Sequence, residues 1–422
     1  MMNNPLKLIP VGSVYKSILP DHEIPNPVPK KMKAWVTYKG TNTVLEEVPV
    51  PKMLPADVLI EPLWISICAS DVNKFVDLVG KLKKTIFGHE FAGRVVATGE
   101  NVNEGLIGKM VVVEEHYPCL HCHECLEGMF DKCRNEGFLG WYKSGNLKDW
   151  VRNGAFAEYV SIHYSCAKPT QGIEKLGFFP SLAEPFGNAV KMGRIVKEKC
   201  DGIPETLAIW GGCGAQALYM VPYFTVLGVK NFVLIYRGKS SMLYMKECIK
   251  DLKARFYFIK HNEDKELERL KNELTQGKGF ITIELTGNEI IQNNVLKYAS
   301  REGKIFYYGL PGGGKNVFIP GTDIDIYSFI TGKAGIDELN IGGITGIRVM
   351  GRDNESWDKT IKVLKAEKKL RNALMKPFVI AGTTRDIGDL VDYLINNGVR
   401  YEEEPYGIRP AKFAVVNDKI MS

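Results

Sequence analysis

The sequence predicts an α/β protein with two domains, one rich in strands and one built on a doubly wound parallel sheet. With 422 residues, the chain is too long for one hydrophobic core of ordinary size. Residues 32–186 hold short β-branched runs, such as DVLIEPLWI and GRVVATG, separated by Gly, Pro and Asn turns, which is typical of a strand-rich domain. Residues 187–344 instead alternate short, nearly continuous apolar runs with helix candidates, as parallel sheets covered on both faces do.

The first 31 residues differ from both predicted domains. They carry six prolines and little hydrophobic periodicity, so residues 1–31 are expected to form an extended arm rather than a core element. No segment there or elsewhere has the apolar run of a secretion signal or of a membrane-spanning helix. We therefore expect a cytoplasmic protein.

The composition is that of an ordinary globular protein with small-molecule partners. The formal net charge of +6 is spread along the chain without a dense Lys or Arg block, which argues against binding to nucleic acid or to a membrane. Nine cysteines, an odd number without an export signal, favour free thiols and metal ligands over a disulfide framework.

Five apolar runs are expected to be strands of the parallel sheet: TLAIW, NFVLIY, RFYFI, FITIEL and KIFYY. The clearest helix between them follows Asn262, a candidate N-cap. A stripe of leucines at helical spacing marks that helix, and Gly277 follows its end. From residue 345 the mixed texture returns, so residues 345–422 are expected to rejoin the first domain.

Four cysteines with the spacing C-x2-C-x2-C-x7-C fall in residues 119–133: Cys119, Cys122, Cys125 and Cys133. Four thiolates at this pitch can surround one tetrahedral Zn²⁺ and leave no position open for a substrate. A redox role for the C-x-x-C pairs would need a thioredoxin-like context, and disulfides would need an oxidising compartment. His121 and His123 are alternative ligands, although we expect both to face solvent. The predicted role of this lobe is structural.

A glycine-rich turn marks the expected cofactor site. Gly212, Gly214 and Ala217 form a G-x-G-x-x-A motif directly after the first apolar run and before a helix. This is the context in which a pyrophosphate can approach a helix N-terminus closely. The next run ends without the Asp or Glu that usually holds the adenosine ribose of NAD.

Basic and hydroxyl residues stand in place of that carboxylate: Tyr236, Arg237, Lys239, Ser240 and Ser241. Because arginine, lysine and serine suit a 2′-phosphate, we predict NADP(H) over NAD(H). The alternative is that this loop is merely solvated.

Several further motifs occur in a defined order: C-x-S-D at residues 68–71, G-H-E-x-x-G at 88–93, the four-cysteine lobe, GAFAEYV at 154–160 and AEPFGNAV at 183–190. From about Met32 to near the C-terminus, this order resembles that of the zinc-dependent medium-chain dehydrogenases, and most of all their polyol (sorbitol) and threonine 3-dehydrogenase branches. The resemblance implies a GroES-like β-rich catalytic domain, carrying the structural zinc lobe, joined to a Rossmann cofactor domain.

The resemblance places the ligands of a catalytic zinc at Cys68, His89 and Glu184, with the carboxylate of Glu90 behind them. Three protein ligands leave one coordination position for water or an alcohol, which makes the site reactive. The alternative for Glu184 is a surface carboxylate before a proline turn.

Three more residues receive roles from the same resemblance. Ser70 lies where the family places the hydroxyl that takes the proton of the alcohol. Asp71 is expected to orient its neighbours, or else to cap a turn. Arg352, in the segment GRDNESW, is a candidate contact of the cofactor phosphates or a surface arginine.

One position departs from the family. Its proton relay often continues through a histidine where this chain has Asn73, which is not a base near neutral pH. We therefore expect the proton to leave through water or a ribose hydroxyl. The aromatic residues Phe75, Trp141 and Tyr142 are candidates for lining the substrate pocket, or else core residues.

We therefore expect a zinc-dependent oxidoreductase with two Zn²⁺ per chain, one catalytic and one structural. Its expected reaction moves hydride between a nicotinamide cofactor and a secondary alcohol or ketone of a polyol, sugar, cyclitol or amino-alcohol. One alternative is an L-threonine 3-dehydrogenase that uses NAD. Another is a catalytically silent nucleotide-binding sensor, which would have lost a ligand of the open site. By analogy with the family, we expect a homodimer or homotetramer.

Overall fold

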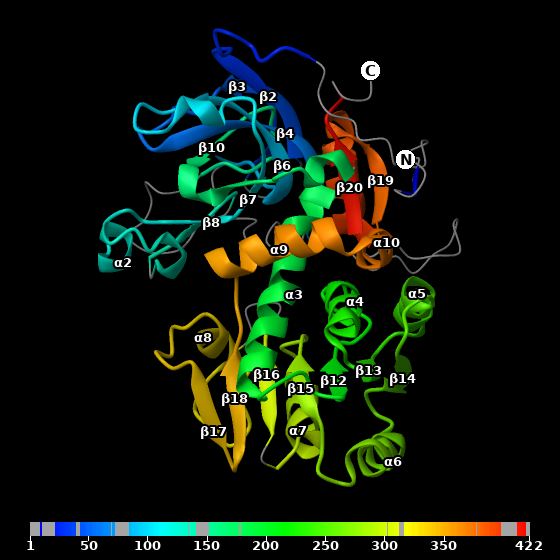
Figure 1. Ribbon diagram of the computed structural model, residues 1–422. Coiled ribbons are helices and arrows are strands. Elements are labelled where there is room, and N and C mark those ends of the chain that lie inside the picture. Colours follow the sequence, from blue (N-terminus) through cyan, green and yellow to red (C-terminus); the bar gives the residue numbers. More distant parts are fainter. Residues whose placement is uncertain are drawn as a thin grey trace.

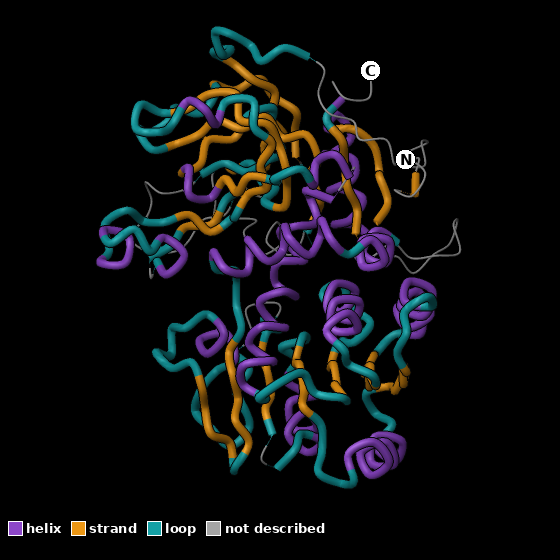
Figure 2. Tube along the Cα trace, viewed as in Figure 1, coloured by secondary structure: helices purple, strands orange, loops and turns teal. Residues whose placement is uncertain are grey.

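The structure is a computed structural model that describes residues 9–10, 22–38, 43–68, 70–71, 84–133, 135–140, 152–176, 179–301, 303–311, 316–376, 378–397 and 412–418. Figure 1 shows two bodies, a strand-rich one above and a sheet flanked by helices below, and the tube in Figure 2 shows the same division. The long helix α3 (Phe179–Lys199) runs from one body into the other. The predictions for Asn73, Phe75, Trp141 and Tyr142 lie outside the described residues.

The strand-rich body is built on an eight-stranded sheet. Its strands follow the order β1-β19-β20-β4-β6-β7-β11, with β10 pairing β4. Their bounds are β1 Ile9–Pro10, β4 Asp57–Ile67, β6 Glu90–Thr98, β7 Met110–Val113, β10 Val160–His163, β11 Ala167–Pro169, β19 Phe378–Thr383 and β20 Lys412–Val416. The C-terminal strands β19 and β20 thus lie in the first body, where the sequence places residues 345–422.

Two smaller sheets complete this body. One pairs β2 (Lys31–Tyr38) with β3 (Thr43–Pro49) and β5 (Lys84–Thr85), and the other pairs β8 (His116–Tyr117) with β9 (Gly137–Phe138). Every residue of β4 is buried, so this strand is covered on both of its faces. It therefore gives the residues that follow it a fixed position.

The described parts of the N-terminal arm pack onto this body. Strand β1 pairs β19 in antiparallel register, with Ile9 opposite Ile380. Further on, the His22 ring lies 3.0 Å from both carboxylate oxygens of the buried Glu61, which also accepts a hydrogen bond from Arg94 at 2.8 Å. These parts of the predicted extension are therefore anchored to the fold.

The second body is a doubly wound Rossmann sheet, with the strand order β14-β13-β12-β15-β16-β18-β17. Adjacent strands are parallel except for the edge pair β17–β18. The bounds are β12 Thr206–Trp210, β13 Asn231–Tyr236, β14 Arg255–Lys260, β15 Ile281–Glu284, β16 Lys304–Tyr307, β17 Glu338–Ile341 and β18 Ile344–Arg348. Chain order reverses between β12 and β15, which is where ligands bind in such folds.

Alternate residues of the central strands enter two different cores. Leu207 and Ile209 of β12 pack with α4 (Ala217–Leu227) and α5 (Lys239–Ile249), while Ala208 and Trp210 pack on the opposite face. That face is covered by α6 (Asp264–Thr275), α7 (Glu289–Tyr298) and α8 (Ile326–Ile330). Four of the five predicted apolar runs are thus buried strands, RFYFI forms the half-buried edge strand β14, and the predicted fold class is confirmed.

The predicted helix after Asn262 is α6, but its predicted cap was wrong. The helix begins at Asp264 with Glu263 as the N-cap, because the Glu263 carboxylate accepts the Lys260 amide at 3.0 Å and its own amide donates to the Lys260 carbonyl. At the other end, Gln276 adopts a left-handed conformation with φ of 53° and Gly277 follows, as expected.

Helices between the two bodies hold them together: α3, α9 (Asn354–Ala366) and α10 (Lys368–Met375). One apolar cluster contains Ala92 and Val112 of the first body, Phe186 of α3 and Leu207 of the second body. A shared core fixes the relative position of the two bodies, so a site between them is also fixed. The remaining helices α2 (His123–Leu126) and α11 (Ile387–Asn397) lie in the first body.

The structure shifts two expected domain boundaries. Strand β18 belongs to the Rossmann sheet, so this domain extends to Arg348 instead of ending at 344. The composition of β18, ITGIR, is mixed, as is typical of a strand near a sheet edge. No continuous apolar run marks this strand in the sequence. Helix α3 continues through the other boundary, at residues 186 and 187. No helix among the described residues has the length and apolarity needed to cross a membrane.

Candidate active site

The Cys68 cluster, formed by Cys68, His89 and Glu90, lies where strands β4 and β6 meet. In this antiparallel pair Ser66 stands opposite Glu90, so Cys68, just after β4, and His89, just before β6, lie at adjoining strand ends. One ligand atom from each of the three residues lies within 4.8 Å of the others. His89 and Glu90 are buried, and Cys68 is half-buried. Strand register therefore brings together a thiol, an imidazole and a carboxylate.

Asp71 holds the imidazole of His89 in place. Its Oδ1 atom lies 3.0 Å from His89 Nδ1, and its Oδ2 atom accepts the backbone amide of Cys68 at 3.0 Å. Burial lowers the pKa of His89, but the charge and hydrogen bond of Asp71 outweigh it and raise that pKa well above its ordinary value. Because Nδ1–H donates to Asp71, Nε2 is the nitrogen available to a metal. Asp71 thus has the orienting position predicted for it.

Ser70 stands next to that second nitrogen. Its Oγ atom is 3.4 Å from His89 Nε2, and the side chain is half-buried. The hydroxyl is therefore beside the metal-binding edge of the imidazole, which is where a group that takes a proton from a bound alcohol is useful.

The Cys68 cluster fits a zinc ion by its donor chemistry. Zn²⁺ accepts thiolate sulfur, imidazole nitrogen and carboxylate oxygen, and two anionic donors balance its charge. One ligand differs from the prediction, which named Glu184 as the third ligand and set Glu90 behind it. The structure groups Glu90 with Cys68 and His89, and turns Glu184 toward Arg352, with which it forms an ion pair.

Arg352 is the centre of a buried ion network. Its Nε and Nη2 atoms donate to the two oxygens of Glu114 at 3.0 and 2.7 Å, and Nη1 donates to Asn188 Oδ1 at 3.0 Å. Glu115 and Glu184 also pair with the guanidinium. Since its donors are occupied by protein acceptors, the structure places Arg352 in this network and not at the cofactor phosphates, the position predicted for it.

The network joins segments far apart in the chain. Glu114 and Glu115 follow β7 in the first body, Glu184 and Asn188 lie on α3, and Arg352 precedes α9. Gly187 makes room for the arginine, since a Cβ atom there would lie 2.7 Å from Arg352 Cδ. The segment EPFGNAV, residues 184–190, thus packs around the guanidinium of Arg352.

Negative charge exceeds positive charge around this network. Burial raises the pKa of Glu184 well above its ordinary value, against the effect of Arg352, and the charges of Glu115 and Glu90 raise it further. His116 lies 3.2 Å from Glu115 and 2.8 Å from Glu136, whose charges raise its pKa despite burial. A surplus of carboxylates next to the Cys68 cluster favours the binding of a divalent cation.

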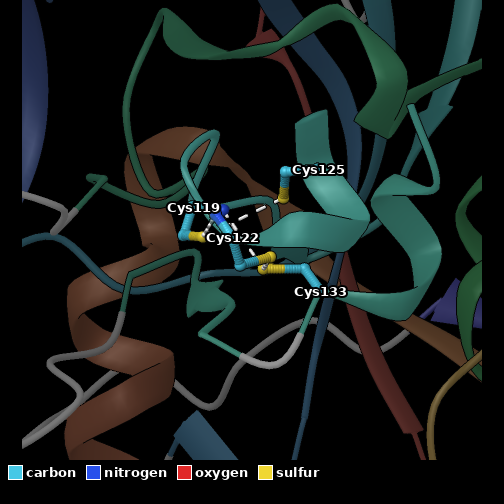
Figure 3. A group of neighbouring side chains, drawn as sticks. All are labelled: Cys119, Cys122, Cys125 and Cys133. Atoms are coloured by element: carbon cyan, nitrogen blue, oxygen red, sulfur yellow. Dashed lines mark hydrogen bonds between the residues drawn. The ribbon is translucent and has the colours of Figure 1, made fainter. Parts of the chain in front are cut away.

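The four cysteines of the lobe converge as predicted, and Figure 3 shows their side chains directed toward one another. All four sulfur atoms lie within 4.8 Å of one another, with Cys119–Cys125 and Cys122–Cys133 separations of 3.9 Å. A tetrahedron of sulfur around zinc, with bonds of about 2.3 Å, has edges of roughly 3.8 Å. The cage therefore matches the size of a zinc ion.

Backbone amides favour the thiolate form of Cys119, whereas burial raises the pKa of Cys125 and that of Cys133. The amide of Cys119 donates to Cys133 Sγ at 3.2 Å, and the amide of Cys122 donates to Cys119 Sγ at 3.3 Å. Burial raises the pKa of the Cys119 thiol, but the amide donors and neighbouring thiols lower it to about 7. A residue that loses its proton near neutral pH is ready to bind a metal.

The glycine-rich turn lies at the carboxyl end of β12 and leads into α4. Gly211 has φ of +79°, and a Cβ atom on Gly212 would lie 2.7 Å from the Ile209 carbonyl oxygen and 2.8 Å from Leu234 Cα. Only glycine fits such a close approach to β13. Gly214 and Ala217 complete a turn that brings the chain to the N-terminus of α4, the place suited to a pyrophosphate.

The basic loop, formed by Arg237, Lys239 and Ser240, follows β13 at the same edge of the sheet. All three residues are exposed, whereas Tyr236 before them is half-buried. Neither Arg237 nor Lys239 forms an ion pair with any residue that the structure describes. The exposed basic side chains are compatible with the predicted binding of a 2′-phosphate and with a solvated loop.

Comparison with known proteins gives the family. A family model described as the alcohol dehydrogenase GroES-like domain matches residues 54–171. A sorbitol dehydrogenase from Bacillus subtilis is 27% identical over 366 residues, which cover 83% of this chain and 98% of that protein. An L-threonine 3-dehydrogenase from Symbiobacterium thermophilum is 30% identical over 283 residues, 65% of this chain and 73% of that protein. The chain belongs to the zinc-type medium-chain alcohol dehydrogenases.

The solved structures agree with this assignment at the level of the fold. An alcohol dehydrogenase from Escherichia coli, in complex with NADH, has a TM-score of 0.67 and 20% identity, covering 92% of this chain and all of that one. This dehydrogenase is therefore an oxidoreductase with the GroES-like and Rossmann architecture that the sequence predicts. The silent alternative predicts a lost ligand at the open site, but the structure brings Cys68, His89 and Glu90 together.

Sequence reasoning missed several members of the site, chiefly Glu114, Glu115 and Asn188. The only local signal for the two glutamates is that they directly follow the buried run VVV, where an acidic pair is unusual unless it has a partner. Asn188 is buried on α3 within the segment that carries Glu184, so a buried amide there was a further sign of a polar partner.

Proposed function

We propose that this dehydrogenase transfers hydride between NADP(H) and a secondary alcohol or ketone of a polyol, sugar, cyclitol or amino-alcohol. The observation that carries the proposal is the convergence of Cys68, His89 and Glu90 beside the hydroxyl of Ser70. Three ligands of this kind leave one coordination position for substrate, in contrast to the closed cysteine cage.

Each residue of the proposed site has a separate part in the reaction. Zinc, when bound by Cys68, His89 and Glu90, supplies a Lewis acid that lowers the pKa of an alcohol. Asp71 keeps His89 in the tautomer that exposes Nε2, and Ser70 is placed to accept a proton beside that ring. Arg352 pairs with Glu184 beside the cluster and balances the charge of this carboxylate.

The preference for NADP(H) rests on the basic loop. No carboxylate follows β13, and the exposed Arg237 and Lys239 stand at the end of the strand that normally carries one. A guanidinium binds a phosphate through two parallel hydrogen bonds, an interaction that NAD(H) lacks because its ribose has a hydroxyl there.

The test compares kcat/KM for both cofactors over a panel of secondary alcohols and ketones, including sorbitol, L-threonine and phosphorylated sugars. We expect NADP(H) to be favoured, and Arg237→Ala to weaken NADPH binding by about 10- to 100-fold while NADH binding is unchanged. Lys230→Ala, an exposed lysine at the opposite end of β13, is the matched control. A preference for NAD(H) would contradict the cofactor proposal, and a panel without any substrate would contradict the substrate class.

The second candidate is an L-threonine 3-dehydrogenase, favoured by the similarity to the enzyme from Symbiobacterium thermophilum. It is weakened by the missing carboxylate after β13, which an NAD enzyme would be expected to have. Efficient oxidation of L-threonine with NAD, together with inactivity toward polyols, would favour this candidate over the first.

A further inference from the structure

Tyr308 is the first residue after β16, on the edge of the Rossmann sheet that carries the glycine-rich turn. Because the strands are parallel, the carboxyl ends of β12, β15 and β16 lie side by side. The amides of Tyr308 and Gly309 both donate to the Glu284 carbonyl at 3.0 Å. Any Cβ atom on Gly309 would lie 2.3 Å from the backbone of Leu285. The backbone at this position is therefore tightly fixed.

Tyr308 and its neighbour Tyr307 point to opposite faces of the sheet. Tyr307 is fully buried in the core on the α7 and α8 face, where its ring lies 5.9 Å from that of Phe329. Tyr308 is only half-buried and packs against the other core, which contains Ala183 and Phe186 of α3. This alternation places Tyr308 on the face of the sheet that α3 covers, and α3 also contacts β4, β6 and β7 of the first body.

The surroundings of the Tyr308 phenol are the groups of the active site. It interacts electrostatically with Arg352, Glu184, Glu115 and Cys68, and burial is the main cause that raises its pKa. A phenol in this setting stays protonated at neutral pH and is a hydrogen-bond donor. Among the described residues, no acceptor forms a hydrogen bond with its hydroxyl.

We propose that Tyr308 contacts the substrate and determines its orientation, by donating a hydrogen bond from its phenol to a substrate oxygen next to the Cys68 cluster. This inference rests on the proposed function, since it needs an alcohol or ketone at that cluster. A second hydroxyl on the carbon adjacent to the reacting one suits such a donor, so Tyr308 favours vicinal diols over simple secondary alcohols.

The test uses Tyr308→Phe, which removes the hydroxyl and keeps the ring. Tyr307→Phe is the matched control, because it removes the neighbouring hydroxyl from the opposite face. With the best substrate of the panel, we expect Tyr308→Phe to raise KM and lower kcat/KM by about 10-fold, and Tyr307→Phe to change either by less than about 2-fold. The Kd of NADPH, from its fluorescence, should be unchanged in both variants.

A binding measurement separates this inference from the proposed function. In the presence of NADPH, sorbitol and 2-butanol are titrated as probes, and the shift of the melting temperature is recorded. We expect sorbitol to stabilise wild type and Tyr307→Phe more than 2-butanol does, and Tyr308→Phe to lose most of the shift that sorbitol produces. Equal shifts of the melting temperature in Tyr308→Phe and wild type would overturn the role of Tyr308 but not the proposed function. A Tyr308→Phe variant whose only defect is a changed Kd of NADPH would do the same. A wild type that neither binds nor oxidises any alcohol would overturn the proposed function and this inference with it.

Discussion

The molecule contains two cysteine-bearing clusters that could each hold a metal ion, and they differ in how their ligands are supplied. The four-cysteine lobe takes all its ligands from residues 119–133, and three of its thiols are buried. The Cys68 cluster takes one ligand from the end of β4 and two from the start of β6, with acidic and basic groups from both bodies around it. The four thiolates of the lobe would fill the coordination of a zinc ion, whereas the three ligands of the Cys68 cluster would leave a position for substrate.

This difference shows how one kind of donor serves two purposes. A thiolate cage made by a short loop needs no partner from elsewhere, so it can organise that loop by itself. A reactive site needs neighbours that hold its ligands, such as Asp71 on His89, and others that balance its charge, such as Arg352. The more conspicuous cluster in the sequence is therefore the less reactive one.

The largest effect is expected from Cys68→Ser, which removes a ligand of the open site. Turnover should fall by about 1000-fold or more, because the ion contributes several kcal/mol to the transition state. Cys200→Ser, at a half-buried cysteine outside both sites, is the control and should keep its activity. Steady-state kinetics and zinc analysis measure the effect. A fully active Cys68→Ser enzyme would show that the Cys68 cluster takes no part in the mechanism.

The next effect is expected from Cys122→Ser in the lobe. Losing one of four ligands should release the structural zinc and lower the melting temperature by about 5 to 10 °C, because the rest of the core remains. The zinc content should fall from two to one per chain, and turnover per remaining folded molecule should stay within a few fold. If turnover instead fell as far as in Cys68→Ser, the division between a structural and a reactive site would be wrong.

A smaller effect is expected from Asp71→Asn, which keeps the shape of the side chain but weakens its hydrogen bond to His89. Metal affinity or kcat should drop by about 10- to 100-fold, as is usual when the partner of a metal-binding histidine is lost. Asp325→Asn, which changes the N-cap of α8 away from the site, is the matched control and should leave both unchanged. Titration with a zinc chelator measures the affinity, and an unchanged value in Asp71→Asn would argue that Asp71 only caps a turn.

The smallest effect concerns pH and the packing of the lobe. The His163 ring lies 4.9 Å from that of Phe130, which packs on the cysteine cluster, and burial lowers the pKa of His163 to about 4. Because the unfolded histidine takes up a proton near pH 6.5, this residue contributes stability above that pH and loses it as the pH falls toward 4. Between pH 7 and 5 the free energy of unfolding should decrease by about 1 to 2 kcal/mol from this cause.

His163→Gln keeps an acceptor for the Ser165 amide but cannot take up the proton. Urea unfolding at both pH values should therefore show a smaller difference in this variant than in wild type. An identical pH dependence in the two proteins would mean that His163 does not contribute.

The fold was predictable wherever the local pattern was strong. The limits of β12 and β13 follow from continuous apolar runs between turns, and each run fits one strand. The start of α6 was not predictable to the residue, because a local turn in which Glu263 bonds to Lys260 sets the N-cap one residue after the better capping residue Asn262.

The active site was predictable only in part. Cys68 and His89 came from a resemblance, and their convergence follows from the pairing of β4 with β6. The sequence does not show whether Glu184 or Glu90 joins Cys68 and His89. That depends on Arg352, which lies 168 residues from Glu184 in the chain and forms an ion pair with it. The segment YYGLPGG at residues 307–313 is expected from the sequence to end a strand near the nicotinamide, but the role proposed for Tyr308 was not predictable, because it depends on strand alternation and on the packing of the two bodies.

The central claim is that the chain holds two zinc ions in these two sites. An anomalous difference map at the zinc absorption edge, from crystals of the protein as purified, tests it most directly. We predict two peaks per chain, one inside the four-cysteine lobe and one within about 2.5 Å of Cys68 Sγ, His89 Nε2 and a Glu90 oxygen. A single peak in the lobe, with none at the Cys68 cluster, would contradict the account.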